Sequence, residues 1–199
     1  MKKYDLKVFI DYIWPWCYLS TVSIEKLKVR YPINVQLIYF PLHPETPEGG
    51  ITLEELFPGR NLNPMKENMK RLMREAGLEY GERSHTFNSR LAQELGKWAD
   101  SQNGKSEIHD LIYRAYFVEG KNISDMNELL KIAETAGFDR ASAKEILEKR
   151  SFKLIVDEDW KKSRELGITG VPTFQHKQHL LVGCQPYEIL AHFVHTPTK

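Results

Sequence analysis

The stretch that decides the fold is Asp11-Tyr12-Ile13-Trp14-Pro15-Trp16-Cys17-Tyr18. The apolar run before it, residues 6–10, predicts a first β-strand, and residues 19–27 after it predict a helix. A strand that stops at a proline-containing corner and opens a helix places the corner's side chains over the helix N-terminus. There, free N–H groups and the positive end of the helix dipole favour an anion. A thiol at this place ionises more easily than in water, and the thiolate is the reactive form.

Working outward, a second strand is predicted at residues 33–40, after the helix ends at Arg30-Tyr31-Pro32. Strand, helix and strand in close succession form a βαβ unit, so we expect the two strands to be parallel and the crossover to be right-handed. The stretch from Pro41 to Gly59 is rich in Pro, Gly and Glu, which predicts a long surface loop that leaves the sheet.

The middle of the chain is predicted to be helical and has no strand candidate. Residues 64–76 carry an apolar stripe of methionines and Leu72, which indicates core packing rather than a binding face. Ser124 is the expected N-cap of a later helix. The other helices are predicted at residues 87–99, 106–118, 125–136, 141–149 and 157–166. Acidic residues 157–159 would satisfy the dipole in the first turn of the last of them.

The sheet resumes near the end of the chain. Residues 173–176 and 179–182 predict a hairpin with its turn near Lys177-Gln178, and residues 187–195 predict a closing helix. The order β-α-β, several helices, β-β-α therefore indicates an α/β fold in two parts. Residues 1–60 and 151–199 form a sheet-and-helix domain, and residues 61–150 form an inserted all-helical domain.

These signals together resemble the DsbA family of thioredoxin-fold proteins. They are most similar to its cytoplasmic branch with FrnE-like oxidoreductases, 2-hydroxychromene-2-carboxylate isomerases and kappa-class glutathione transferases. The two anchors of the resemblance are residues 11–18 and Gly170-Val171-Pro172-Thr173-Phe174. Supporting stretches are residues 40–47, 87–92 and 114–120. The resemblance implies a thioredoxin-like fold with a DsbA-like helical insertion.

Pro172 matches the position of the family's cis-proline. Sequence chemistry alone favours a trans turn proline before an edge strand, because cis bonds are a small minority of X–Pro bonds. The resemblance implies the cis form instead. The backbone of Val171 would then be free to bond an extended thiol peptide, such as glutathione, as though it were another strand.

The corner departs from the family pattern. In redox-active members the corner reads Cys-x-x-Cys, of which the first cysteine attacks and the second resolves the mixed disulfide. The isomerase and transferase branches place a serine first. Here the four candidate catalytic positions read Trp14, Pro15, Trp16 and Cys17. Trp14 offers only an indole N–H, and Cys17 matches the resolving position, where burial raises a thiol pKa, so a two-cysteine exchange confined to this corner is excluded.

Three interpretations stay open. In the first, Cys17 acts alone or with Cys184, which the hairpin should return to the same edge of the sheet. The alternative to this interpretation is that both thiols are buried and inert. In the second, the chain binds thiols or uses glutathione as a co-substrate, as an isomerase or transferase does. Trp16, Tyr18 and Asn88 would then line its pocket. In the third, the chain is a non-catalytic binding protein on the same scaffold.

Other polar clusters are weaker candidates. His176 and His179 straddle the hairpin turn before Cys184, but a solvated turn is favoured and no metal site is predicted. His43 lies in a Pro/Gly-rich loop, which favours a surface loop residue over a general acid or base. Asp11, at a strand end, could either cap the corner or tune the Cys17 proton.

Composition limits the class of partner. The 199 residues carry a formal net charge of +1, so no electrostatic footprint for nucleic acid or an anionic membrane is present. No apolar run reaches the roughly 18 residues of a membrane span. The first residues lack the apolar region of a signal peptide, and two distant cysteines are no disulfide scaffold, so we expect a cytoplasmic protein without a tightly bound cofactor. A homodimer is compatible with these features.

Overall fold

The computed structural model describes residues 4–102 and 107–195. Its centre is a four-stranded sheet in the order β2-β1-β5-β6. The strands are β1 (Tyr4–Ile10), β2 (Ile33–Tyr39), β5 (Thr173–His176) and β6 (His179–Val182). β1 and β2 are parallel, and β5 is antiparallel to both β1 and β6. The predicted βαβ unit and the closing hairpin are therefore confirmed.

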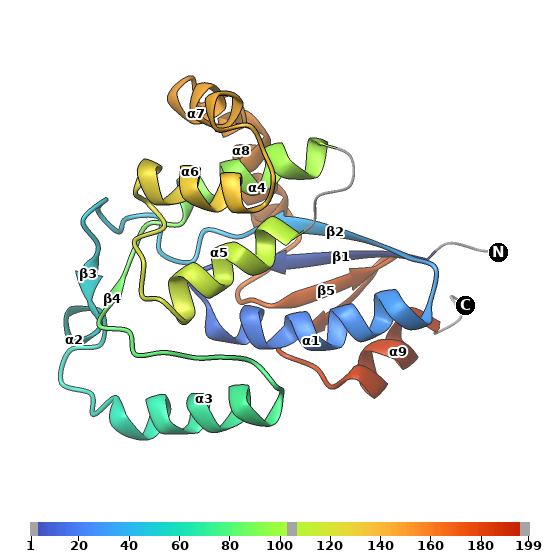
Figure 1. Ribbon diagram of the computed structural model, residues 1–199. Coiled ribbons are helices and arrows are strands. Elements are labelled where there is room, and N and C mark those ends of the chain that lie inside the picture. The colour runs from blue at the N-terminus through green and yellow to red at the C-terminus, as the bar shows by residue number, and fades with distance from the viewer. Residues whose placement is uncertain (1–3, 103–106, 196–199) are drawn as a thin grey trace.

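Helices cover both faces of this sheet. α1 (Pro15–Arg30) and α9 (Tyr187–His195) lie together on one side, and α8 (Lys153–Glu165) packs against β2 from the other (Figure 1). The backbone N–H of Tyr39 donates to Oδ2 of Asp159 at 2.9 Å, which fixes α8 to the end of β2. The β1–α1 corner opens at that same end of the sheet, where Ile10 of β1 pairs with Tyr39 of β2.

The chain between β2 and α8 is mostly helical. Its longer helices are α3 (Asn63–Glu75), α4 (Arg90–Ser101), α5 (Glu107–Phe117), α6 (Met126–Thr135) and α7 (Arg140–Glu148). Buried apolar side chains of this segment and of the sheet form one continuous core. The division into separate domains at residues 60 and 150 stays a prediction.

Four expectations for this segment are wrong. β3 (Ile51–Thr52) pairs with β4 (His85–Thr86), so the middle of the chain does contribute a strand. α2 (Leu53–Leu56) interrupts the predicted loop of residues 41–59, where Thr52 and Glu55 form a capping box. The N-cap of α6 is Asp125, whereas the Ser124 hydroxyl donates to the carbonyl of Glu48 at 2.6 Å.

The fourth correction concerns α8, which begins at Lys153 rather than at residue 157. Residues 157–159 therefore do not serve a first turn. Asp157 accepts a hydrogen bond from Arg90 at 2.7 Å. Asp159 is buried and lies 2.7 Å from Nζ of Lys97, a contact that ties α8 to α4.

The methionine stripe of α3 divides between two environments. Met69 and Met73 are buried, as core packing predicts, but Met65 is 49% exposed. Figure 1 shows α3 beside the N-terminal end of α1, away from the sheet. One end of the stripe is thus left facing the corner.

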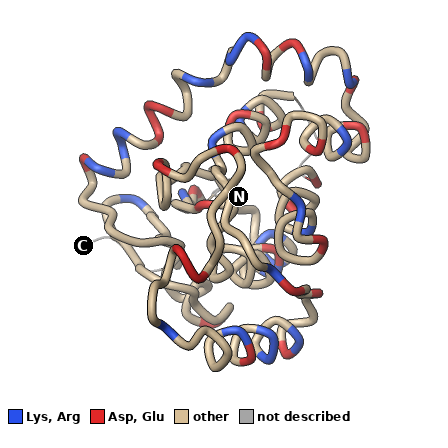
Figure 2. The backbone as a smooth tube through the Cα atoms, turned by 90° about the vertical axis from the view of Figure 1, so that its left-hand side faces the viewer, with Lys and Arg blue, Asp and Glu red and all other residues tan. Residues whose placement is uncertain are grey.

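Charges of both signs are interspersed along the backbone (Figure 2). Most of the ion pairs between described residues join neighbours in sequence or neighbouring helices, as between Arg71 and Glu75 at 2.8 Å. In the described part of the chain, no helix is both long enough and apolar enough to cross a bilayer.

Candidate functional site at the β1–α1 corner

The corner is built by Trp14 and Pro15. Trp14 is the N-cap of α1 with an extended backbone, and its side chain makes no capping hydrogen bond. Pro15 starts the helix, where its fixed φ suits the first turn and its missing N–H costs nothing. The positive end of the α1 dipole is therefore open toward the side chains of Trp14 and Trp16.

Cys17 lies one turn into α1 and faces inward. It is 1% exposed. Burial raises the pKa of its thiol well above the ordinary value, and a hydrogen bond with the backbone of Asp11 opposes this shift without cancelling it. Between the helix dipole, which favours the thiolate, and burial, which disfavours it, burial prevails. At neutral pH this sulfur is a protonated thiol.

Cys184 is the second sulfur near the corner. The backbone N–H of Gly183 donates to the carbonyl of Pro172 at 2.8 Å, so the hairpin does return Cys184 to the expected edge. Its thiol is half-buried and near the Ser20 hydroxyl, and burial raises its pKa. Cys17 and Cys184 are both free. A functional pairing of the two stays a prediction.

Val171 and Pro172 lie beside the corner. β1 and β5 pair with Phe9 opposite Thr173, so the two residues before β5 continue alongside the end of β1. The Val171–Pro172 peptide bond is cis. Within residues 4–102 and 107–195, neither the backbone N–H nor the carbonyl of Val171 has a hydrogen-bond partner. The backbone of this buried residue therefore has an unused donor and an unused acceptor, which is what strand addition requires.

A groove of about 90 Å³ opens between the corner and α3. Its walls are mainly apolar: Trp14, Pro15, Trp16, Leu53, Phe57, Met65, Met69 and Tyr80. Lys66, Lys70 and Arg83 add positive charge, and Glu82 pairs with Lys70. The groove therefore suits an apolar group that carries an anion.

Arg83 is one of the groove residues that the sequence did not reveal. Its guanidinium carbon lies 4.9 Å from the ring centroid of Tyr116 and 5.2 Å from that of Phe117. It donates to the Tyr116 hydroxyl, and within the described chain it forms no ion pair. No periodic pattern surrounds Arg83, so the sequence held no signal for it; only the packing of residues 80–83 against α5 reveals its place.

Asp11 is fully buried behind the corner. Its carboxylate accepts hydrogen bonds from the backbone N–H groups of Ile13, at 3.2 Å, and Leu42, at 3.1 Å. Burial raises its pKa from the ordinary 3.8 to about 6, against the opposing effect of these bonds and of Ser89. The residue caps the corner, which is one of its two predicted roles.

Two predicted pocket residues lie elsewhere. Tyr18 is fully buried, its ring 5.3 Å from that of Tyr113 and 5.5 Å from that of Phe117, so it belongs to an aromatic stack in the core. Asn88 uses its amide to donate to the carbonyls of Pro44, at 3.2 Å, and Thr46, at 2.8 Å. Both residues support the site without lining the groove.

The weaker clusters have structural partners. His43 lies 3.5 Å from Glu45, and Nδ1 of His176 bonds to the carbonyl of Asp5 at 2.8 Å. Among the described residues, no three His, Cys, Asp or Glu side chains gather as a metal site would require.

Comparison with known proteins places this geometry in a family. Residues 5–195 match the DSBA-like thioredoxin domain. The chain belongs to this family. Nearly the whole described chain is covered, including the corner, the helical segment and the Val171–Pro172 edge, so the DsbA-like thioredoxin fold with a helical insertion is established.

Two relatives from Bacillus subtilis (strain 168) are similar in sequence. The uncharacterised protein YwbO is 28% identical over 85% of this chain and 84% of its own length. The ClpXP adapter protein SpxH is 26% identical over 89% of this chain, which spans 60% of the length of SpxH.

Several solved structures have the same fold. A probable DsbA oxidoreductase from Streptomyces coelicolor superposes with a TM-score of 0.88 at 24% identity, covering 98% of this chain and 93% of that one. A 2-hydroxychromene-2-carboxylate isomerase gives 0.73 at 18% identity, covering 95% and 93%. The cytosolic disulfide reductase DsbM from Pseudomonas aeruginosa, solved with GSH, gives 0.63 at 20% identity, covering 89% and 88%.

Family membership sharpens the meaning of Trp14. Two of the solved structures that share this fold are named as a probable oxidoreductase and an isomerase. This chain carries at the first position of the corner neither a thiol nor a hydroxyl. The chain thus has the fold of the family with an indole at the position where the resemblance implies a cysteine or a serine.

Proposed function

We propose that this chain binds extended thiol-containing peptides, such as glutathione, along the backbone of Val171, and that it does so without dithiol exchange. One observation carries the proposal. The unpaired backbone edge of Val171 lies beside a corner at which Trp14 stands in the first position and the nearest thiol, Cys17, is buried. The unpaired edge of Val171 supports binding, and Trp14 together with the buried Cys17 supports the absence of exchange.

The buried thiol argues against a redox role. Exchange begins with attack by a thiolate on a disulfide sulfur, so it needs an exposed sulfur with a pKa near the ambient pH. Cys17 offers neither property. A ligand thiol at this edge would meet the indole of Trp14 instead of a second sulfur.

The groove supports a peptide ligand. An extended peptide that pairs with Val171 gains main-chain hydrogen bonds, and its neighbouring side chain would reach the apolar wall formed by Trp14, Trp16 and Tyr80. Lys66 and Arg83 supply cations that suit a carboxylate. Glutathione, with its two carboxylates, is a ligand of this kind. A glutathione-dependent transferase or isomerase is the catalytic form of the same proposal.

Calorimetric titration tests the proposal. Glutathione and S-methylglutathione are titrated into the wild type and into Cys17→Ser. We expect both ligands to bind and the dissociation constants to agree within about twofold between the two proteins. Loss of binding in Cys17→Ser would overturn the proposal, because the buried thiol would then be needed.

Adding a cysteine at the first position of the corner tests whether its absence explains the lack of dithiol exchange. The wild type should not accelerate the reduction of insulin by dithiothreitol, whereas Trp14→Cys restores the Cys-x-x-Cys pattern and should do so. Trp16→Cys is the matched control, because it adds a thiol to the same corner at a position where none attacks. Wild-type activity that disappears in Cys17→Ser would contradict the absence of exchange.

A non-catalytic adapter is the second candidate, favoured by the similarity to SpxH, which is named as a ClpXP adapter. The exposed end of the α3 methionine stripe, at Met65, and the apolar groove would then contact a protein partner. Absence of heat with glutathione, in a protein with an intact thermal transition, would favour this function over the first.

A reducing, cytoplasmic setting is part of the proposal. Cys17 and Cys184 are free thiols, which persist in reducing compartments, and the similar disulfide reductase DsbM is named as cytosolic.

A further inference from the structure

A second cavity, of about 320 Å³, lies between α1, β2 and the beginning of α5. It shares no lining residue with the groove beside the corner. Its size falls at the lower end of the range for small-molecule sites. The function proposed above makes no use of it.

The floor of this cavity is apolar. Ile10 comes from β1, Ile24 from α1, and Val35 and Leu37 from β2, with the buried sulfur of Cys17 beside them. An apolar body of small size would therefore leave water on binding here, which is the usual driving force for such sites.

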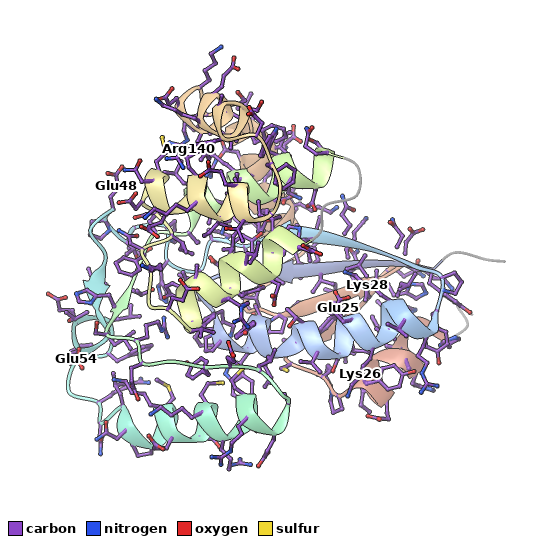
Figure 3. All side chains as sticks on the ribbon, viewed as in Figure 1. Glu25, Lys26, Lys28, Glu48, Glu54 and Arg140 are labelled. Carbon is purple, nitrogen blue, oxygen red and sulfur yellow. The ribbon has the colours of Figure 1, made fainter. Side chains whose placement is uncertain are left out.

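The rim of the cavity is acidic. Its charged lining consists of four carboxylates, Glu25, Asp100, Glu107 and Asp110, and one ammonium group, Lys28. Lys28 is paired with Glu25 at 2.7 Å, and Figure 3 shows both rising from α1 toward the sheet. Across the described chain, Glu107 and Asp110 form no ion pair. Among the described lining residues, negative charges therefore outnumber positive ones, and outside the lining the charge of Arg114 acts on Asp110.

His109 fixes one wall. Its Nε2 lies 2.9 Å from Oδ1 of Asp100, and its Nδ1 lies 2.6 Å from the hydroxyl of Tyr12, which in turn lies 2.7 Å from that of Tyr39. Both ring nitrogens have a partner within the protein. His109 therefore holds Asp100 at the rim and has no ring nitrogen left to bond to a ligand.

Tyr113 provides the observation that points to a ligand. It lines the cavity and is 2% exposed. Its hydroxyl is buried and, among residues 4–102 and 107–195, has no hydrogen-bond partner. Buried hydroxyls in native proteins nearly always have a partner, so this one needs an explanation. A polar atom of a bound molecule would satisfy it.

We propose that this cavity binds a small organic amine with a polar substituent on an apolar body. The body lies on the floor between Ile24 and Val35. The ammonium group faces Glu107 and Asp110 at the rim, and the substituent bonds to the Tyr113 hydroxyl inside. This site is separate from the peptide site at Val171.

Tyramine is a probe with these three features. Its ring is apolar, its amine is cationic at neutral pH, and its phenol can bond to Tyr113. Phenethylamine lacks the phenol hydroxyl, and 3-(4-hydroxyphenyl)propionate replaces the cation by an anion. In titrations of the full chain we expect tyramine to bind, phenethylamine to bind about tenfold more weakly, and the propionate to show no binding.

Two variants assign the contacts. In Tyr113→Phe, tyramine should lose its advantage over phenethylamine, because the hydroxyl partner is gone. In Glu107→Gln/Asp110→Asn, both amines should bind about tenfold more weakly. Since Glu107 and Asp110 are exposed, this double variant will fold even if Tyr113→Phe does not. Glu145→Gln/Glu148→Gln on α7 is the matched control, with two carboxylates removed outside the cavity and no expected change.

Amide chemical shifts locate the ligand. Tyramine should move the signals of Thr21, Ile24 and Val35 and leave those of Trp14 and Val171 unchanged, so failure here is distinct from failure at the peptide site. Three results would each overturn the proposal: no binding of tyramine at about 10 mM, equal binding of the propionate, or unchanged affinity in both the Tyr113 and the Glu107/Asp110 variants.

Discussion

The carboxylate of Asp11 accepts the backbone N–H of Leu42 at 3.1 Å, so one buried acid joins the β1–α1 corner to the loop that follows β2. The same carboxylate accepts the N–H of Ile13 at 3.2 Å. Without Asp11, one buried and one partly buried N–H group beside the site would lose their acceptor, which costs free energy. The corner thus owes its shape to a group that burial makes hard to ionise.

Asp11 makes stability depend on pH. Burial raises its pKa from 3.8 to about 6 in the folded state. The stabilisation from this group is therefore fully present below about pH 4 and is lost as the pH rises through about 6. Asn does not titrate, so the free energy of unfolding of Asp11→Asn should gain about 2 kcal/mol relative to the wild type between pH 4 and pH 7. Urea unfolding at a series of pH values measures this difference.

Asp139→Asn serves as the control for that series. Hydrogen bonds from Ser142 lower the pKa of Asp139 at the N-cap of α7. Its stabilisation is present at neutral pH and lost as the pH falls, so the difference between this variant and the wild type should change in the opposite direction. Parallel pH profiles for wild type and Asp11→Asn would refute the raised pKa.

The two cysteines should differ in reactivity. Cys17 is buried with a pKa raised well above the ordinary thiol value, whereas Cys184 is only half-buried. We expect iodoacetamide at pH 7 to label Cys184 at least tenfold faster than Cys17. Peptide mass spectrometry over time gives both rates in one experiment, and denaturation in urea should make the rates equal. Rapid labelling of Cys17 in the folded protein would restore the redox interpretation.

The fold was predictable where the signal was local. The corner of residues 11–18, the hairpin turn at Lys177-Gln178 and the apolar periods of α3 to α7 can each be recognised within a short window of sequence. The two-residue strands Ile51–Thr52 and His85–Thr86 could not, because two residues show no period and their pairing depends on tertiary contacts.

The site was predictable only in part, for a related reason. The corner is one continuous stretch of sequence and the Val171–Pro172 edge is another, so each can be recognised as a motif. The cavity beside Tyr113 is assembled from β1, β2, α1 and α5, and no spacing in the sequence connects them. Asn88 was expected to line the pocket. Its amide instead donates to two carbonyls of the loop after β2, so it stabilises that loop.

Gly96 on α4 should not tolerate a side chain. A Cβ added there would overlap the hydroxyls of Tyr39 and Tyr12. Although Ala favours a helix over Gly, we expect Gly96→Ala to lower the free energy of unfolding by about 2 kcal/mol because the site is overpacked. Tyr39→Phe in the same chain removes one of the two hydroxyls and should recover part of the loss, so the two substitutions should be less destabilising together than their sum. Additive effects would show that the overlap is relieved elsewhere.

Glu94 should be a larger contributor to stability than the exposed carboxylates. Its side chain is fully buried and lies 2.8 Å from Nε of Arg90 and 2.7 Å from Nη2 of Arg150. Glu94→Gln keeps the shape but leaves the half-buried Arg90 facing a neutral amide, so we expect a loss of about 3 kcal/mol in denaturant unfolding. Glu148→Gln removes an exposed carboxylate that lies 3.6 Å from Lys144, and it should change stability by less than about 0.5 kcal/mol. Equal effects of the two substitutions would mean that the buried carboxylate gains nothing from its two arginines, and that α4 is held to the loop after α7 by apolar packing alone.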